Sequence, residues 1–205
     1  MKKIIIVILL IICHFHFSST LFADEDKLNI NEAKKNYKKV YFAGGCFWCM
    51  EESFDKIDGV VKSISGYSGG HLKNPSYQEV IYKDTGHVEA IEVTYDPKII
   101  DYKKLLNIFW KNIDPFDAYG QFCDKGKSYR SVLFYKDLNQ KNIIESSLSN
   151  VEKKFNTKVV TLIWKFEKFY PAEKYHQDYY QKNFIKYLAY KKACQRNEVL
   201  EKIWN

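Results

Sequence analysis

Arginine is almost absent from this chain of 205 residues: only Arg130 and Arg196 occur, and the other basic residues are lysines interleaved with acids. A nucleic-acid-binding domain clusters its positive charge and favours arginine. The net charge of +7 therefore indicates a solvated surface, and we expect no nucleic-acid partner. Glycine and proline are also scarce, with 9 and 4 residues, which excludes collagen-like and low-complexity chains. The 28% of charged residues excludes a polytopic membrane protein.

The N-terminus has the pattern of a secretory signal peptide. Lys2 and Lys3 precede an apolar run over residues 4–12, and the small Ala23 precedes the first acidic residue, Asp24. The run is well short of the ~20 residues that a membrane span needs. We therefore expect a signal peptide over 1–23, cleavage, export to a bacterial periplasm and no stable membrane insertion of the mature chain. An uncleaved N-terminal anchor is the alternative.

Apolar periodicity after residue 23 predicts one domain of helices and strands. We expect a flexible lead-in over 24–37 and a single α+β domain over 38–205. The last strong strand is expected over 158–164, and Glu92 is expected to face solvent. The expected strands cover 38–43, 60–67, 88–95 and 131–135, and the expected helices cover 47–57, a short segment capped by Asn74 and Pro75, 102–113, and 144–155 with Asp137 as a possible cap.

Cleavage removes Cys13 and leaves an even number of cysteines, which can cycle as disulfides in an oxidising compartment. Cys46 follows two glycines and begins a helix. There a thiol faces the positive end of the helix dipole, which favours the reactive thiolate. Phe47 lies on the apolar stripe of this helix, whereas Trp48 lies off it and can form the wall of a pocket. A buried structural cysteine is the alternative.

Cys46 and Cys49 form a C-x-x-C pair, which is compatible with a thioredoxin-like dithiol or with half of a metal site. The metal interpretation lacks a second C-x-x-C pair and a histidine at ligand spacing, so we expect no metal. The dithiol interpretation lacks the small or Pro-Gly residues usual between the cysteines. A cysteine protease would need a partner among the three remaining histidines.

Glu89 lies in the strand expected over 88–95, where alternation places it on the apolar face with Ile91 and Val93. Burial there raises the pKa of a carboxyl group, which then stays protonated and can act as an acid. The alternative is that Glu89 lies at the strand end and bends into water.

The segment Gly45-Cys46-Phe47-Trp48-Cys49-Met50-Glu51 resembles the active-site motif of A-type peptide methionine sulfoxide reductases. The resemblance continues in the same order over roughly residues 38–196. It is carried by Ser65-Gly66-Tyr67-Ser68-Gly69-Gly70, Asn74-Pro75-Ser76-Tyr77, Gly86-His87-Val88-Glu89-Ala90, Tyr95-Asp96-Pro97, Phe109-Trp110, Gln121-Phe122-Cys123-Asp124, Ser128-Tyr129-Arg130-Ser131 and the region from Tyr170 to Tyr180.

This resemblance implies a split-βαβ, ferredoxin-like mixed sheet and the reduction of the S epimer of methionine sulfoxide, free or in proteins, without a cofactor. It implies that Cys46 attacks the sulfoxide sulfur and becomes a sulfenic acid, while Glu89 protonates the oxygen. The other implied roles are hydrogen bonds from Tyr77 and Tyr129 to that oxygen, a cradle for the methyl group from Phe47 and Trp48, and substrate binding by Asp124.

The resemblance also implies that a second cysteine condenses with the sulfenic acid and that a thioredoxin-like donor reduces the disulfide. The candidates are Cys49, Cys123 and Cys194. Cys123 is expected to be a small buried residue. Cys194 has lysines before it and Arg196 after it, which favours its thiolate. Its segment resembles the family's resolving-cysteine region, although Ala193 and Gln195 replace glycines common there. We predict a Cys46–Cys194 disulfide, with Cys49 as a possible relay.

Two other classes of function stay open from the sequence. A thiol–disulfide oxidoreductase using Cys46 and Cys49 would reduce insulin and ignore methyl sulfoxides. A non-enzymatic binding protein would show binding that weakens steeply with salt, without turnover.

Overall fold

The computed structural model describes residues 36–205. The expected signal peptide and nearly all of the expected lead-in lie outside the described residues. Within 36–205, no helix combines the length and the apolar character that crossing a membrane requires.

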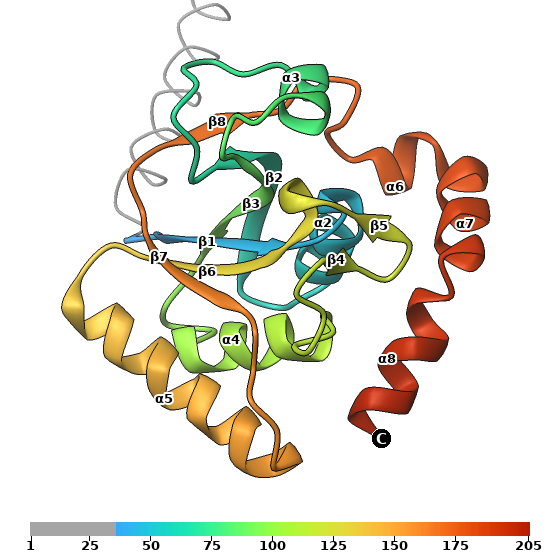
Figure 1. Cartoon of the computed structure of the whole chain (residues 1–205). Coiled ribbons are helices and arrows are strands. Elements are labelled where there is room, and N and C mark those ends of the chain that lie inside the picture. The colour runs from blue at the N-terminus through green and yellow to red at the C-terminus, as the bar shows by residue number, and fades with distance from the viewer. Residues whose placement is uncertain (1–35) are drawn as a thin grey trace, which may run out of the picture. The chain divides into compact units, whose positions relative to one another are not determined.

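A six-stranded mixed sheet forms the centre of the described chain (Figure 1). Neighbouring strands are antiparallel except β6 and β7, which are parallel. In spatial order the strands are β7 (Leu162–Lys165), β6 (Ser131–Tyr135), β1 (Lys38–Gly44), β3 (Val88–Tyr95), β2 (Val60–Ser68) and β8 (Phe169–Pro171).

The four central strands form two interlocked split βαβ units. Strands β1 and β2 are joined by helix α2 (Phe47–Asp55), with β3 inserted between them. Strands β3 and β6 are joined by helix α4 (Tyr102–Lys111), with β1 inserted between them. This order confirms the expected ferredoxin-like α+β sheet. It also brings the last residues of β1 and the first residues of α2 beside β3.

The main hydrophobic core lies between one face of the sheet and the helices α2, α4 and α5 (Leu138–Phe155). Alternation along β1 and β3 directs Phe42 and Ile91 into this core, as the apolar period of two predicts. Helix α5 begins where the Asp137 side chain accepts a 2.8 Å hydrogen bond from the backbone N–H of Gln140, so the suggested cap is confirmed.

Glu92 lies on the opposite face of β3, but the expectation that it faces solvent is wrong. It is only 8% exposed and accepts hydrogen bonds of 2.8 Å from the Tyr41 hydroxyl and the Lys39 ammonium group. Phe166 stacks on Tyr41 with ring centroids 3.8 Å apart, so this face carries a second apolar cluster. The sequence could not show that a later segment covers it.

Several local expectations need correction. The cap of the short helix α3 (Tyr77–Tyr82) is Ser76, which forms a capping box with Glu79, and not Asn74 with Pro75. The last strong strand begins at Leu162, later than expected, and strand β8 follows it. The irregular stretch before β6 contains a hairpin of β4 (Gly120–Gln121) and β5 (Asp124–Lys125) and the 3-10 turn η1 (Lys127–Tyr129).

Helices that the sequence pattern did not predict follow β8. They are α6 (Tyr179–Lys182), α7 (Phe184–Ala193) and α8 (Arg196–Trp204), and α7 and α8 lie along one side of the domain in Figure 1. Gln195, between α7 and α8, has a φ of +52°, a left-handed conformation that glycine adopts more easily. This explains why a glycine suits that position.

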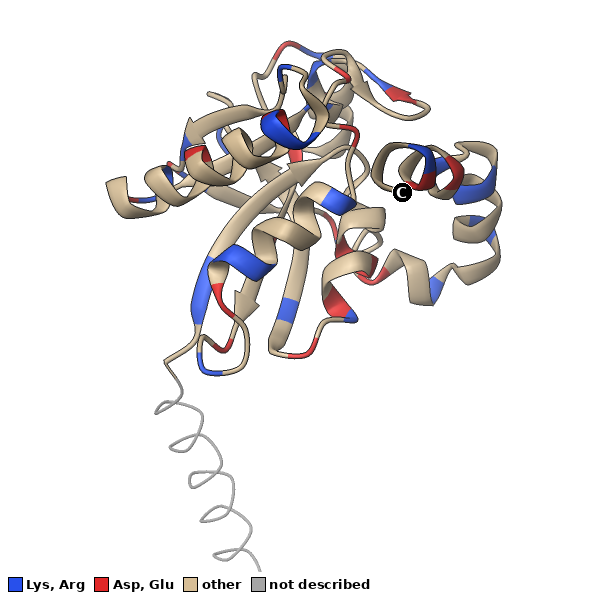
Figure 2. Ribbon diagram, turned by 90° about the horizontal axis from the view of Figure 1, so that it is seen from below, with Lys and Arg blue, Asp and Glu red and all other residues tan. Residues whose placement is uncertain are grey.

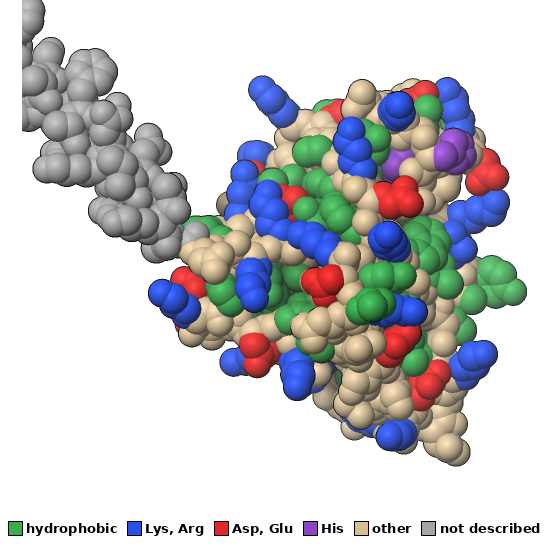
Figure 3. Space-filling model, turned by 90° about the vertical axis from the view of Figure 1, so that its left-hand side faces the viewer, with side chains coloured by type: hydrophobic (Ala, Val, Ile, Leu, Met, Phe, Trp, Pro, Cys, Tyr) green, Lys and Arg blue, Asp and Glu red, His purple; other side chains and the backbone are tan. Residues whose placement is uncertain are grey.

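Basic and acidic residues are interspersed over the elements in Figure 2, and lysines lie beside acids on the face shown in Figure 3. Ion pairs such as Lys39 with Glu92 and Lys191 with Glu52 use part of this charge. The distribution agrees with the interpretation of the net charge as a solvated surface.

Candidate active site

The site is built around Cys46, which lies between the end of β1 and the start of α2. Gly45 has a φ of +75°, and a Cβ atom added there would lie 2.5 Å from Cβ of Gln121. Glycine is therefore required at this turn. Cys46 is the N-cap residue of α2, so the predicted sharp strand-to-helix turn is present.

A small cavity of about 80 Å³ opens beside Cys46. It brings together most of the residues that the sequence singled out, although they come from the start of α2, α3, β3, β5, η1 and α7. Its lining consists of Cys46, Phe47, Trp48, Tyr77, Glu89, Asp124, Tyr129 and Tyr190. Of these, only Tyr190 was not assigned a role from the sequence.

Glu89 is 2% exposed and points toward the start of α2. Its Oε2 atom accepts a 2.9 Å hydrogen bond from the backbone N–H of Phe47. Burial raises the pKa of Glu89 well above its usual range, and although the Phe47 hydrogen bond lowers it, the charges of Asp124 and Cys49 raise it further. The raised pKa favours the protonated carboxyl group, which can donate its proton inside the cavity.

Burial works against the thiolate that the helix start was expected to favour at Cys46. Cys46 is 4% exposed, and burial raises its pKa, as do Cys49 and the acids Glu89 and Asp124. The Cys49 pKa is instead lowered, by a hydrogen bond from Cys46 and by the charges of Arg196 and Lys191. The backbone N–H of Phe47, the first free N–H of α2, donates its hydrogen bond to Glu89 and not to the Cys46 sulfur.

An aromatic wall covers the other side of the cavity. Trp48 stacks on Tyr179 with ring centroids 3.7 Å apart, and its Nε1–H donates a 3.1 Å hydrogen bond to Nδ1 of His176. Burial lowers the pKa of His176, which keeps the ring neutral and Nδ1 an acceptor. His176 therefore has the structural hydrogen-bonding position that the sequence favoured over a catalytic one.

Tyr77 and Tyr129 supply phenol groups to the cavity. Burial raises the pKa of both tyrosines, and the nearby Glu89 contributes to each shift. Both phenols therefore stay protonated and can donate hydrogen bonds. The backbone N–H of Tyr77 donates 2.8 Å to Glu173 Oε1, while the Tyr67 hydroxyl donates 2.8 Å to Oε2 of the same carboxylate, which fixes the start of α3.

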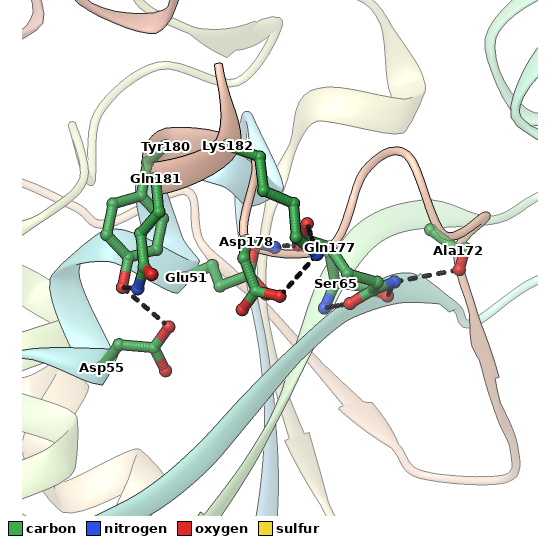
Figure 4. Close-up of polar contacts among 9 residues, drawn as sticks. All are labelled: Glu51, Asp55, Ser65, Ala172, Gln177, Asp178, Tyr180, Gln181 and Lys182. Carbon is green, nitrogen blue, oxygen red and sulfur yellow. Dashed lines mark hydrogen bonds and ion pairs between the residues drawn. The ribbon is translucent and has the colours of Figure 1, made fainter. Parts of the chain in front are cut away.

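The segment that carries His176 and Tyr179 is tied to β2 and α2 by buried polar contacts (Figure 4). Gln177 accepts a 3.0 Å hydrogen bond from the backbone N–H of Ser65 and donates 2.9 Å bonds to the carbonyls of Ser65 and Ala172. These contacts add a strand-like pairing beyond the end of β8, and they hold the aromatic wall in place.

Glu51 anchors the same segment from α2. This residue has no exposed surface, and its Oε2 atom accepts hydrogen bonds from Ser65 Oγ at 3.1 Å and from the backbone N–H of Asp178 at 3.2 Å. Its Oε1 atom is buried without a hydrogen-bond partner among the described residues. Burial raises the pKa of Glu51 to about 7. The sequence placed Glu51 in a motif but gave it no role.

Tyr190 of α7 closes the cavity from the C-terminal side. Its hydroxyl donates a hydrogen bond to Oδ2 of Asp124, and its ring meets Trp48 edge-on with centroids 5.9 Å apart. Burial raises the pKa of Asp124, while Tyr190 and Arg196 lower it. The sequence missed Tyr190 because one tyrosine among many near the C-terminus carries no distinguishing signal.

The remaining cysteines are arranged differently from the expectation. Cys123 is exposed and forms a disulfide with Cys194, with Cα atoms 4.9 Å apart, while Cys46 and Cys49 are free and buried. The expectation of a buried Cys123 is wrong, because the β4–β5 loop that carries it lies on the surface. The predicted Cys46–Cys194 disulfide is not the one present in this structure.

Within residues 36–205, two groups bring three metal-ligating side chains together. One consists of Cys123, Asp124 and Cys194, but its two sulfurs are bonded to each other. The other consists of Glu51, Asp55 and Asp178, where Asp55 accepts bonds from Ser63 and Tyr180, and Asp178 pairs with Lys182 at 2.8 Å. Because hydrogen bonds use most of these oxygens, neither group is assigned to a metal.

Comparison with known proteins agrees with this geometry. A sequence profile of the family described as peptide methionine sulfoxide reductase matches residues 38–205. The chain is 47% identical to the peptide methionine sulfoxide reductase MsrA of Listeria monocytogenes over 173 residues, which cover 83% of this chain and 98% of the relative.

Solved structures show the same relationship. Methionine sulfoxide reductase A of Corynebacterium diphtheriae superposes with a TM-score of 0.66 at 29% identity, over 73% of this chain and 76% of that one. Mxr1 from Saccharomyces cerevisiae in reduced form gives a TM-score of 0.68 at 33% identity, over 72% and 86% of the two chains. Mxr1 in complex with Trx2 gives 0.50 at 25%, over 70% and 84%. The profile match across the whole described domain, the near-complete alignment with a curated relative and the shared fold show that the chain belongs to the peptide methionine sulfoxide reductase family.

Proposed function

We propose that the chain reduces methionine sulfoxide with Cys46 as the nucleophile and Glu89 as the acid. The chain is a peptide-methionine (S)-S-oxide reductase, because it aligns with curated reductases over 98% of their length. The observation that carries the residue assignment is the position of Glu89: a buried carboxyl group with a raised pKa lines the same small cavity as the Cys46 thiol.

The chemistry balances with these groups alone. Cys46 loses its proton and its sulfur attacks the sulfoxide sulfur, while Glu89 gives its proton to the sulfoxide oxygen. The oxygen is transferred to Cys46, which becomes a sulfenic acid, and methionine leaves. The sulfoxide gains two electrons and Cys46 loses two. The proton from the Cys46 thiol restores Glu89.

The walls of the cavity account for the choice of epimer. Phe47 and Trp48 offer an apolar surface to the methyl group, and Glu89, Tyr77 and Tyr129 offer donors to the oxygen. The third substituent of the sulfoxide sulfur, the methionine chain, must extend out of the cavity. Inverting the sulfur centre exchanges two of these groups, which places a polar oxygen against aromatic rings or a methyl group against unpaired donors. This arrangement supports selection of the S epimer.

A second cysteine converts the sulfenic acid into a disulfide with loss of water, and a thioredoxin-like donor reduces it. The yeast relative Mxr1 has been solved in complex with Trx2, which supports a donor of this kind here. The enzyme thereby repairs oxidised proteins and peptides.

We also propose that the mature enzyme begins near Asp24 and works in the bacterial periplasm. The support is the sequence alone: Lys2, Lys3, the apolar run over 4–12 and Ala23. A periplasmic enzyme needs electrons from a membrane route through a periplasmic thioredoxin-like domain. N-terminal sequencing of the protein from the envelope fraction tests this: an intact Met1 on membrane-bound material would support the anchor instead.

The decisive test of the activity uses the mature protein, dithiothreitol and a peptide carrying either the S or the R epimer of methionine sulfoxide. We expect methionine from the S epimer only. Turnover of the R epimer at a similar rate would contradict the assignment, and insulin reduction without sulfoxide reduction would indicate a thiol–disulfide oxidoreductase.

A further inference from the structure

A second, larger cavity lies next to the catalytic one. It has a volume of about 540 Å³ and is lined by residues 80–87 and 125–130; we call it the basic groove. Pockets of this volume hold small ligands. Tyr129 lines both the basic groove and the catalytic cavity. Because the two cavities share this wall residue, a polypeptide that leaves the catalytic cavity past Tyr129 enters the groove.

The charged side chains around Tyr129 are divided between the two cavities. Glu89 and Asp124 line the catalytic cavity, whereas Lys125, the next residue of β5, lines the basic groove. Consecutive residues of a strand point to opposite faces, so β5 separates this acid from this lysine. The charged residues that line the groove are the cations Lys83, Lys125, Lys127 and Arg130 and the acid Asp84.

Two of these cations already have acidic partners outside the lining of the groove. Lys83 pairs with Glu79 at 3.1 Å, four residues earlier in the chain, and Lys125 pairs with Asp117. Neither of these acids lines the groove. Lys127 and Arg130 are therefore the cations that a ligand in the groove can engage first.

Lys127 has a weak and replaceable partner. Its ammonium group lies 3.2 Å from a carboxylate oxygen of Asp84, but the two side chains are 75% and 78% exposed. Ion pairs that are this exposed contribute little free energy, so a carboxylate of a ligand can compete with Asp84. The neighbouring Gly126 leaves the groove open, since a Cβ atom added there would meet no atom within 4 Å.

Arg130 has no acidic partner among residues 36–205. Its Nε–H donates a 3.1 Å hydrogen bond to the carbonyl of Lys127, and its guanidinium carbon lies 5.6 Å from the ring centroid of Trp164. These contacts fix the guanidinium group and leave its two terminal nitrogens without a hydrogen-bond partner in the described part of the chain. Two such nitrogens form the fork that matches a carboxylate.

An exposed aromatic ring borders the same groove. Tyr82, the last residue of α3, lines the groove and is 80% exposed. Exposed tyrosines are enriched in surfaces that bind other polypeptides, whereas lysine is depleted from the centre of such surfaces. The groove therefore combines an apolar contact for a peptide with cations that favour an acidic one.

We infer that the basic groove binds the part of the substrate polypeptide next to the methionine sulfoxide, and that Arg130 and Lys127 select an aspartate or glutamate there. This inference rests on the proposed function, since it concerns the chain attached to the sulfoxide. Tyr129 and Arg130 are consecutive residues, and an extended chain advances about 3.4 Å per residue. The selected acidic residue therefore lies within about three positions of the sulfoxide.

The test compares peptides that differ in one residue. Each peptide carries one S-methionine sulfoxide among neutral residues, with glutamate, glutamine or lysine placed in turn at each of the three positions on either side. The mature protein reduces them with dithiothreitol. At the best position we expect kcat/KM for glutamate to exceed that for glutamine by about threefold to tenfold, mainly through KM, because a charge-assisted bond forms. The lysine peptide should be the poorest substrate.

Raising the salt concentration from about 0.02 M to about 0.5 M should reduce this preference, because salt screens exposed charges. Arg130→Gln should lower the ratio of the glutamate to the glutamine peptide by about twofold or more. Lys127→Glu should reverse the preference, so that the lysine peptide becomes a better substrate than the glutamate peptide.

Lys98→Glu is the matched control for Lys127→Glu. It makes the same change of charge at an exposed lysine beyond the far end of β3, whereas the groove lies at the His87 end of that strand. Lys98→Glu should keep the wild-type preference. Thermal unfolding of each variant shows whether it folds.

The outcomes separate the two proposals. If no peptide yields methionine with dithiothreitol, the proposed function fails. If all peptides are reduced with equal kcat/KM, or the wild type prefers the lysine peptide, only the role of the groove fails. A preference that Lys127→Glu and Arg130→Gln leave unchanged, or that Lys98→Glu alters as strongly as Lys127→Glu, would also overturn the inference.

Discussion

The backbone N–H of Phe47 donates a 2.9 Å hydrogen bond to Oε2 of Glu89. This bond links the first residue of the helix that begins at the nucleophile with the strand that carries the acid. The same interaction lowers the pKa of Glu89, but burial raises it by more, so the bond holds the carboxyl group in position while its pKa stays raised. The Phe47 backbone therefore fixes the position of the acid relative to the nucleophile.

Replacement of the nucleophile should abolish the reaction. Cys46→Ser should release no methionine from the S-epimer peptide even with excess dithiothreitol, because a hydroxyl at this position cannot form the sulfenic acid. Cys49→Ser removes the neighbouring buried thiol and is the matched control, and it should still form one sulfenic acid per chain. Substantial turnover by Cys46→Ser would refute the assignment.

Replacement of the acid should slow the chemical step without preventing binding. Glu89→Gln keeps the shape and the acceptor for Phe47 N–H but removes the proton, so kcat should fall by about 10²–10⁴-fold. Glu92→Gln, on the opposite face of the same strand, is the control, and its kcat should stay within about twofold of the wild type. A Glu89→Gln enzyme with near wild-type kcat would show that this carboxyl group is structural.

Glu51 should make the protein less stable as the pH rises. The pKa of Glu51 is raised from 4.5 to about 7 in the folded state. The contribution of Glu51 to the free energy of unfolding is therefore fully present below pH 4.5 and is lost as the pH rises to 7. In urea titrations, the unfolding free energy of Glu51→Gln relative to the wild type should therefore increase between pH 4.5 and 7.5, by up to about 3 kcal/mol.

Glu52→Gln is the matched control for that experiment. Burial alone would raise the pKa of Glu52, but Lys191, Lys56 and Tyr187 lower it to about 2. Its contribution is already complete above pH 4.5, so the difference between this variant and the wild type should stay constant from pH 4.5 to 7.5. A parallel pH dependence in the two variants would contradict the assignment to Glu51.

The hydrogen bond between Trp48 and His176 should contribute to substrate binding. Trp48→Phe removes this bond and part of the contact with Tyr179, and a hydrogen bond worth about 1 kcal/mol corresponds to roughly a fivefold rise in KM. Trp110→Phe removes a comparable indole hydrogen bond, to Ser147, in the core. Trp110→Phe should lower the melting temperature and leave KM unchanged. Equal KM values for the two variants would show that the hydrogen bond of Trp48 does not contribute to substrate binding.

Local patterns predicted the parts of the site that depend on one element. The alternation in 88–95 placed Glu89 on the core face, and the glycines before Cys46 predicted the sharp turn, because both follow from backbone geometry. The order of the strands followed from the resemblance to a family and not from periodicity.

What the sequence could not predict depends on contacts between distant segments. Cys123 and Cys194 are 71 residues apart, and no local signal tells which cysteine pairs with which. The Cys46 pKa depends on how completely Tyr190 and its neighbours cover the thiol. Helices α7 and α8 were missed because their apolar residues do not form a single stripe, and Glu92 because the segment that covers it lies more than 70 residues away in the chain.

The small size of the catalytic cavity, about 80 Å³, limits which damaged methionines can reach Cys46. By the same measure one water molecule needs roughly 10–15 Å³, so the cavity has room for the end of a methionine side chain. A sulfoxide packed inside a folded protein stays out of reach until its surroundings open. We therefore expect the repair of a buried methionine sulfoxide to depend on how often the substrate protein opens locally around it.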